Sequence, residues 1–300
     1  MVSVCVIMST YNGEKYLGEQ LDSILGQRNV EIKIFVRDDG STDSTVSILD
    51  KYSETGRLEY IVGDNLGAAK SFMSAIMLAP ESEYYAFSDQ DDIWEENKLD
   101  EAVKAIQKCA REEMPILYHS KVKITNARGE VVGENGRYEH RGFLNGYCGY
   151  VIGCTAVFNH ALMSYLKKYN PQTLIMHDAW VKDVCIAVEG KVIFDNNAYI
   201  CYRQHGNNVV GGGDDLRSKI KRRIKYYKKR PNKVNKYTLQ ELLKGYKGDM
   251  SPDKVSRAEM LCNYDKSIKN MFKVLGEKSY FSGNFLWGVE QYLLILFHRY

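Results

Sequence analysis

The first hundred residues alternate between short apolar runs and segments whose apolar side chains recur every three or four positions. Helical spacing is clearest where Leu17, Leu21 and Ile24 fall on one stripe. Four runs rich in β-branched or aromatic residues have the composition of buried strands, at 2–8, 32–36, 58–62 and 84–87. Strands and helices in alternation predict an α/β fold, with a Rossmann-like, mainly parallel sheet flanked by helices.

Polar segments follow three of these strands directly, at 9–13, 37–43 and 88–92. In an open α/β sheet the carboxyl ends of parallel strands share one edge, and ligands bind there. We therefore expect the three polar segments to gather at one edge of the sheet.

The third polar segment carries three carboxylates, Asp89, Asp91 and Asp92, within four residues. Alternate carboxylates at the end of a strand project to one side, where, with waters and substrate phosphates, they would hold Mg²⁺ or Mn²⁺. The alternative is a solvated turn in which Asp92 caps the helix expected from Glu95. The two other polar segments are expected at the same edge of the sheet, which favours the metal site over the solvated turn.

From residue 115 onwards the pattern is less regular. Helices are expected at 161–168 and from 176, and a polar, glycine-rich loop at 137–148. Gly153-Cys154-Thr155 interrupts one of the expected strands. These strands are short and lie at 116–124, 131–132, 149–158, 192–194 and 199–202.

The composition changes near residue 215. Residues 216–236 contain eleven Lys or Arg and no Asp or Glu, and apolar residues recur there at helical spacing. This pattern predicts a basic amphipathic helix, either a solvated surface helix or one that contacts an anionic membrane surface. Residues 285–297 form a second, aromatic and apolar helical segment, so a C-terminal helical appendage is expected.

Composition excludes several classes of protein. The net charge of +3 is small for 300 residues, so no nucleic-acid partner is expected. Seven dispersed cysteines without a C-x-x-C pair indicate reduced thiols. We see no signal-peptide pattern and no apolar segment of about 18 residues, so a cytoplasmic location is expected, with peripheral contact to the inner face of the cell membrane left open.

Three motifs together resemble the family-2 glycosyltransferases of the GT-A fold: Ser9-Thr10-Tyr11-Asn12, Asp38-Asp39-Gly40-Ser41-Thr42-Asp43 and Asp89-Gln90-Asp91-Asp92. His177-Asp178 is similar to a later acidic motif of that family, with His in place of the usual Glu. Residues 202–208 resemble the rhamnosyltransferase-type members of bacterial polysaccharide pathways. The resemblance covers residues 1–212 as a glycosyltransferase domain, and residues 213–300 form the separate basic and amphipathic helical region.

The resemblance implies a nucleotide site. Thr10 and Tyr11 would line it, with the Tyr11 ring against the base. Asp39, or its neighbour Asp38, would accept the imide N–H of a pyrimidine, which gives base selectivity. Lys70 would meet the diphosphate, although a solvated helix lysine explains it equally well.

The resemblance also implies the metal and sugar sites. Asp91 would bind the cation directly, and Asp89 would touch the ribose, the sugar or a metal-bound water. Asp178 would be the general base. His205 is a further candidate ligand, with a polar turn histidine as the alternative. Five further residues would line the sugar or acceptor site: Gly153, Cys154, Thr155, His177 and Trp180. Of these, Trp180 fits a core position better.

The implied activity is that of an inverting, metal-dependent glycosyltransferase acting in surface polysaccharide synthesis. Its donor would be dTDP-L-rhamnose, with UDP-hexoses left open, and its acceptor a saccharide or a lipid-linked saccharide. The alternatives are a non-catalytic nucleotide-sugar-binding module and a nucleotidyltransferase, which usually needs a basic, Gly-rich loop that residues 9–13 lack. Whether the chain forms a homodimer is left open.

Overall fold

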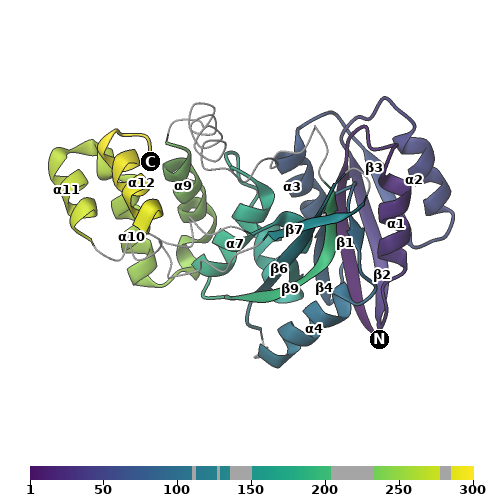
Figure 1. Cartoon of the computed structure of the whole chain (residues 1–300). Coiled ribbons are helices and arrows are strands. Elements are labelled where there is room, and N and C mark those ends of the chain that lie inside the picture. Colours follow the sequence, from purple (N-terminus) through teal and green to yellow (C-terminus); the bar gives the residue numbers. More distant parts are fainter. Residues whose placement is uncertain (110–112, 127–128, 136–150, 204–232, 278–284) are drawn as a thin grey trace.

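The computed structural model describes residues 1–109, 113–126, 129–135, 151–203, 233–277 and 285–300. Within them, nine strands form one sheet, in the order β3-β2-β1-β4-β8-β6-β9-β5, with β7 paired to β6 (Figure 1). The strands are β1 Val2–Thr10, β2 Val30–Asp38, β3 Leu58–Val62, β4 Tyr84–Ser88, β5 Ile93–Trp94, β6 Ile116–Thr125, β7 Val131–Asn135, β8 Val157–Asn159 and β9 Lys191–Arg203.

Helices cover the sheet and extend beyond it at the C-terminal end of the chain (Figure 1). The helices of the first part of the chain are α1 Leu17–Leu25, α2 Thr45–Ser53, α3 Ala68–Leu78, α4 Lys98–Cys109, α6 His160–Lys168 and α7 His177–Ala187. Those of the C-terminal part are α9 Val234–Tyr246, α10 Pro252–Cys262, α11 Ile268–Gly276 and α12 Phe285–Leu296. The expected C-terminal helices are therefore present, whereas the basic segment 216–236 lies largely outside the described residues.

The strand order explains where the polar segments lie. β3, β2, β1 and β4 are mutually parallel, and the chain steps outwards from β1 to β3 before it returns to β4. The carboxyl ends of β1 and β4 thus flank the point at which the strand order reverses, which is where open α/β sheets bind ligands. The polar segments after β1, β2 and β4 share this edge, as expected.

Both faces of β1 are buried, which accounts for its nearly continuous apolar sequence. Cys5 and Ile7 belong to a cluster that includes residues of α3, α6 and α7. Val4, Val6 and Met8 belong to the cluster on the other side, with residues of α1 and α4. The central strand is therefore held from both faces.

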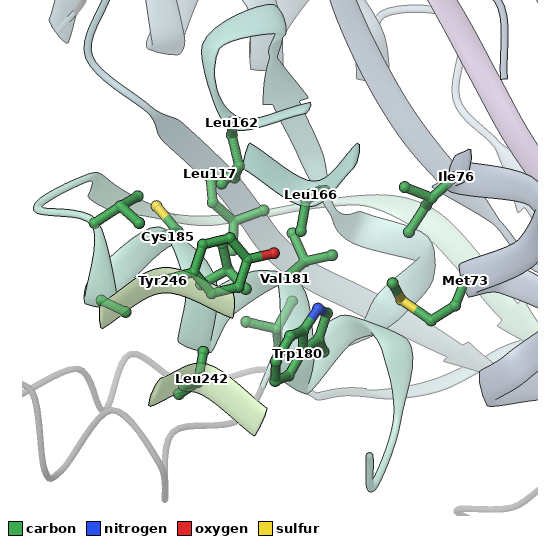
Figure 2. Close-up of a cluster of buried hydrophobic side chains, with 14 of the residues drawn as sticks. Met73, Ile76, Leu117, Leu162, Leu166, Trp180, Val181, Cys185, Leu242 and Tyr246 are labelled. Atoms are coloured by element: carbon green, nitrogen blue, oxygen red, sulfur yellow. The ribbon is translucent and has the colours of Figure 1, made fainter. Parts of the chain in front are cut away.

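The first cluster continues into the C-terminal helices. Trp180 of α7 and Tyr246 of α9 have ring centroids 6.1 Å apart, and Leu242 lies beside them (Figure 2). The region from residue 234 onwards accordingly shares buried side chains with the sheet domain.

Two sequence-based expectations on strands were wrong. The segments 192–194 and 199–202 are one strand, β9, because its pairing with β6 tolerates an irregularity between Ser120 and Lys121. Within 149–158, the described part is a strand only from Val157 to Asn159. Gly153–Thr155 forms a 3₁₀ turn instead, closed by Ala156 N–H donating to the carbonyl of Gly153.

The helix after the acidic segment begins at Lys98, later than expected, because Ile93 and Trp94 pair with β9 as β5. Asp92 therefore precedes a strand and cannot cap that helix. Its carboxylate accepts a hydrogen bond from the backbone N–H of Arg203 at 3.3 Å.

Candidate active site

Asp38, the last residue of β2, is fully buried and supplied with donors. Its Oδ1 accepts from the hydroxyls of Thr10 at 2.8 Å and Ser41 at 2.6 Å, and its Oδ2 accepts from the Ser41 N–H at 2.8 Å. These bonds join the ends of β1 and β2. A carboxylate has about four acceptor positions, so Oδ2 retains one for a ligand.

Asp39 is also buried, and it organises the loop before α3. It forms an ion pair with Arg37 and accepts from the backbone N–H groups of Leu66 at 2.9 Å and Gly67 at 2.8 Å. Arg37 in turn donates to the Ser71 hydroxyl at 2.9 Å. The Asp39 carboxylate thus holds the loop before α3 in place and is also a candidate contact for a nucleotide base.

Tyr11 and Lys70 are the two predicted nucleotide contacts that remain accessible. The Tyr11 side chain is 48% exposed, and Lys70, in the first turn of α3, is exposed. The Tyr11 backbone is fixed by Gln90, whose amide accepts from the Tyr11 N–H at 2.8 Å and donates to its carbonyl at 3.1 Å. This pair of bonds joins the polar segments after β1 and β4, and it leaves the Tyr11 ring free to face a ligand.

The segment after β4 differs, because its carboxylates face one another. Asp89 is half-buried, and burial, followed by the negative charges of Asp91 and Asp178, raises its pKa to about 7. Asp92 is 1% exposed, and burial and the same kind of repulsion from Asp89 and Asp91 hold its pKa well above the ordinary value. The fold thus keeps several acids close together, and burial and mutual repulsion raise the pKa values of Asp89 and Asp92.

Asp178 joins this acidic cluster from the first turn of α7. Its Oδ1 accepts from the N–H of Ala179 at 2.6 Å, a position favoured by the helix dipole. Burial raises its pKa to about 6, while the backbone hydrogen bond and the charge of Lys182 act in the opposite direction. A carboxylate with such a pKa is an effective proton acceptor near neutral pH.

One group of close-lying side chains combines the half-buried Asp89 with two buried residues. Asp89, Asp92 and Cys154 offer ligand atoms that all lie within 4.8 Å of one another. The Oδ2 atom of Asp92 is buried and has no hydrogen-bond partner among the described residues. The Nζ of Lys98 is likewise buried and unpartnered there, 3.3 Å from the centre of the Trp94 ring, and burial lowers its pKa to about 7.

These observations test whether a divalent cation fits. Buried carboxylates with raised pKa values and an orphaned oxygen are what a cation would relieve, and oxygen donors suit Mg²⁺ or Mn²⁺. Asp89 and Asp91 are half-buried beside the buried Asp92, so the predicted acidic segment has the donors for such an ion. The other predicted ligand, His205, lies outside the described residues.

His177 lies behind Asp178 and is 3% exposed. Its ring stacks on Phe72 at 3.8 Å between centroids and meets Phe87 edge-on at 4.9 Å. Neither ring nitrogen has a hydrogen-bond partner among the described residues, and burial lowers the pKa of His177 to about 3, so the ring is neutral. A Cβ on Gly153 would lie 3.1 Å from its Nε2, so glycine permits this close approach.

The remaining sugar-site candidates are all buried. Cys154 and Thr155 are inaccessible, and the Thr155 hydroxyl donates to the Ile152 carbonyl at 2.8 Å. Trp180 packs in the hydrophobic cluster of Figure 2, in agreement with the core position that the sequence favoured.

Sequence reasoning missed the contributions of Gln90, Lys98 and the buried carboxylate of Asp92. The acidic run named Asp92, but only as a helix cap. Gln90 lay within the motif without an assigned role. Nothing in the sequence marks Lys98 as buried, because a lysine at the start of a helix is ordinarily solvated.

A Rossmann-like sheet with carboxylates at its switch point, and a separate aspartate at a helix N-terminus, is the arrangement expected from the resemblance to sugar transferases of the GT-A type. Residues 5–166 match the model of glycosyl transferase family 2, which spans more than half of the chain, and the chain belongs to this family. The predicted family and fold class are confirmed.

Individual relatives agree with this assignment. The dTDP-rhamnosyl transferase RfbG of Shigella flexneri is 29% identical over 269 residues, which cover 81% of this chain and 90% of that protein. The structure of Staphylococcus aureus TarS 1–349 with UDP-GlcNAc has a TM-score of 0.59 at 18% identity, covering 98% of this chain and 81% of that one. Mannosyltransferase PcManGT from Pyrobaculum calidifontis, in complex with GDP-Man and Mn²⁺, has a TM-score of 0.53 at 15% identity, covering 98% and 84%.

Proposed function

We propose that this glycosyltransferase is an inverting, metal-dependent enzyme that moves L-rhamnose from dTDP-L-rhamnose onto a saccharide or lipid-linked saccharide in surface polysaccharide synthesis. The observation that carries the chemistry is Asp178, a half-buried carboxylate whose pKa is raised to about 6 and which faces the acidic segment after β4. One base and one leaving-group site are the minimum that such a transfer requires.

Asp178 accepts the proton of the acceptor hydroxyl as that oxygen attacks the anomeric carbon, on the face opposite the leaving diphosphate. The Ala179 N–H orients its carboxylate through Oδ1. Attack and departure on opposite faces invert the anomeric centre. The reaction therefore forms no covalent intermediate and needs no second carboxylate as a nucleophile.

Asp91 is the proposed direct ligand of Mn²⁺ or Mg²⁺, with Asp89 beside it and His205 as a further ligand from the segment that is not described. A bound cation would supply charge neutralisation for the departing diphosphate. Asp89 would otherwise contact the ribose or the sugar of the donor.

The nucleotide would lie over the ends of β1 and β2. The exposed ring of Tyr11 would stack on the base, and Thr10 would line its edge. Asp38 or Asp39 would accept the imide N–H through the acceptor position left on Oδ2. Lys70, exposed at the start of α3, would approach the diphosphate.

The likeness to RfbG, whose name specifies dTDP-rhamnose, supports the donor, as does the segment 202–208. A UDP-hexose donor is the second candidate, because TarS was solved with UDP-GlcNAc. The basic segment 216–236 would bring the enzyme to anionic lipid carrying the acceptor. In the described part of the chain no helix is long and apolar enough to cross a membrane.

The test is a thermal-shift panel of dTDP, UDP, GDP, ADP and CMP with Mn²⁺, followed by donor turnover. A nucleotide at about 100 times its dissociation constant stabilises the fold by about 2.7 kcal/mol, which is easily measured. A metal-dependent preference for dTDP, with release of dTDP from dTDP-L-rhamnose, is the expected result. A preference for UDP would replace the donor, and binding without turnover in the presence of acceptor polymers would indicate a binding module.

A further inference from the structure

A thiol lies among the carboxylates beneath the acidic segment, and the role of Asp91 as a cation ligand does not use it. Cys154 is fully buried in the 3₁₀ turn Gly153–Thr155, and its Sγ lies within 4.8 Å of carboxylate oxygens of Asp89 and Asp92. Three donors of this kind, drawn from two separate segments of the chain, can surround one small ion.

The second observation is the unsatisfied carboxylate of Asp92. The residue is 1% exposed, yet its Oδ2 has no hydrogen-bond partner among the described residues. A buried polar atom without a partner costs about 1–3 kcal/mol, so folds retain such atoms mainly where a ligand completes them. Asp92 is itself one of the three donors, so the residue with the unpartnered oxygen is part of the site.

The third observation is that the neighbouring cation does not satisfy Asp92. Lys98 lies close to Asp92 and Cys154. Its Nζ makes no hydrogen bond within the described residues and lies 3.3 Å from the centre of the Trp94 ring. The unpartnered oxygen of Asp92 is therefore left for a ligand.

We propose that Asp89, Asp92 and Cys154 form a binding site for a thiophilic divalent cation, Zn²⁺ or Cd²⁺, which differs in its ligands from the Mn²⁺ or Mg²⁺ position at Asp91. Thiolate selects Zn²⁺ and its heavier congener, whereas Mg²⁺ and Mn²⁺ prefer oxygen. Binding exchanges the thiol proton of Cys154 for a metal–sulfur bond, and the proton leaves to solvent. Because Asp89 lies beside the position proposed for the hard cation, a thiophilic ion bound to Asp89 opposes binding of that cation.

The experiment is a titration of the full-length chain with Cd²⁺ under reducing conditions that do not chelate the metal, with the ultraviolet thiolate-to-cadmium charge-transfer band as readout. The wild type should give a saturable band. Cys154→Ser should abolish it, and Asp92→Asn should weaken binding by roughly 10–100-fold, the range found when metal-site partners are removed. Mg²⁺ should produce no band.

Cys109→Ser is the matched control, because Cys109 is a half-buried thiol whose Sγ already lies 3.3 Å from the Lys191 ammonium. It should leave the band unchanged. A band that survives Cys154→Ser, or that disappears with Cys109→Ser, would overturn the proposal.

Cadmium NMR of the wild type keeps the proposal testable if Cys154→Ser does not fold. A resonance in the range of one sulfur with oxygen ligands is expected, and one in the all-oxygen range, or in that of several sulfurs, would refute the site. Both readouts are independent of sugar transfer, so a failure of the proposed donor or acceptor leaves them interpretable.

Discussion

At the carboxyl edge of the sheet, Asp38 and Asp39 after β2 are surrounded by donors, whereas Asp89 and Asp92 after β4 face mainly other acids. Asp39 has a guanidinium and two backbone N–H groups, and Asp38 has two hydroxyls and one N–H. Oδ1 of Asp92 accepts a long hydrogen bond from the Arg203 N–H, and its Oδ2 has no hydrogen-bond partner among the described residues. Residues 37–43 and 88–92 each contain three aspartates, but the surroundings of these carboxylates are opposite.

The difference separates two uses of a buried carboxylate. Where the protein supplies donors, the carboxylate ties strands and loops together. Where donors are withheld, the carboxylate has a raised pKa and is held in place by the rest of the fold, which is typical of functional sites. The predictions below follow from this contrast.

The largest effect is expected for Asp178→Asn. The amide keeps the shape of the side chain but cannot accept the proton of the acceptor hydroxyl, so kcat should fall roughly 10²–10⁴-fold. Donor binding should persist, because Asp178 is proposed to act on the acceptor hydroxyl and belongs to α7, whereas the predicted contacts to the base come from the ends of β1 and β2. The measurement is turnover with the identified donor and acceptor, beside a nucleotide thermal shift.

Asp183→Asn is the control for this prediction. Asp183 is a second buried acid on α7, but its Oδ1 lies 3.3 Å from the Lys182 ammonium, so its role is that of an ion-pair partner. It should lower stability while the folded enzyme keeps most of its kcat. Equal losses of kcat in both variants would remove Asp178 as the base.

The next prediction compares the two acidic segments directly. Asp39→Asn leaves the buried Arg37 without its carboxylate, and breaking a buried ion pair in this way costs about 3–5 kcal/mol. Asp92→Asn removes a buried carboxylate whose pKa is raised by burial and like charges, so at neutral pH it should leave the protein as stable as the wild type or more stable. Urea unfolding at neutral pH measures both, and a loss for Asp92→Asn as large as that for Asp39→Asn would contradict the contrast.

The sequence predicted the fold far better than it predicted the different surroundings of the carboxylates after β2 and β4. Buried parallel strands carry continuous apolar runs, so β1 to β4 were recognisable. β9 was divided in two because Asp195-Asn196-Asn197 has the composition of a turn. In the structure Asp195 does make a turn-type hydrogen bond, accepting from the Asn197 N–H at 2.9 Å. It also accepts from the Tyr118 hydroxyl of β6 at 2.9 Å, and the segment remains within one irregular strand.

The site residues were predicted as a group, but their surroundings were not. Sequence spacing placed Asp89 and Asp91 at the edge of the sheet, and the resemblance to the glycosyltransferase family added Asp178. It could not indicate that Asp92 points inwards, since the side on which a residue lies is fixed only while the strand continues. The burial of Lys98 depends on packing against Trp94, which is tertiary information.

The pH dependence of stability tests the raised pKa values. Asp89 has a folded-state pKa of about 7, above its ordinary value of 3.8, so the folded state binds the proton more tightly. Its contribution to stability is complete below about pH 4 and is lost as the pH rises through 7. Wild type should therefore be less stable than Asp89→Asn at pH 8 by about 1–3 kcal/mol, with the gap closing at pH 4, since one pKa unit corresponds to about 1.4 kcal/mol.

Urea unfolding of the two proteins without divalent cations, at several pH values, measures this gap. His177 acts in the opposite sense, because its lowered pKa of about 3 makes its contribution complete above pH 6.5 and lost as the pH falls. Both proteins contain His177, so its effect cancels in the difference. A gap that is independent of pH would refute the raised pKa of Asp89.

The smallest effect concerns the link between the segments after β1 and β4. A Cβ on Gly13 would lie 2.5 Å from Oε1 of Gln90, so Gly13→Ala must displace the amide that pairs with the Tyr11 backbone. Losing this exposed pair of hydrogen bonds should cost about 1–2 kcal/mol in urea unfolding. Gly276→Ala, where a Cβ meets nothing within 4 Å, is the control and should be neutral or slightly stabilising. Equal effects would mean that Gln90 adapts, and the segments after β1 and β4 would then be held in register by the strands alone.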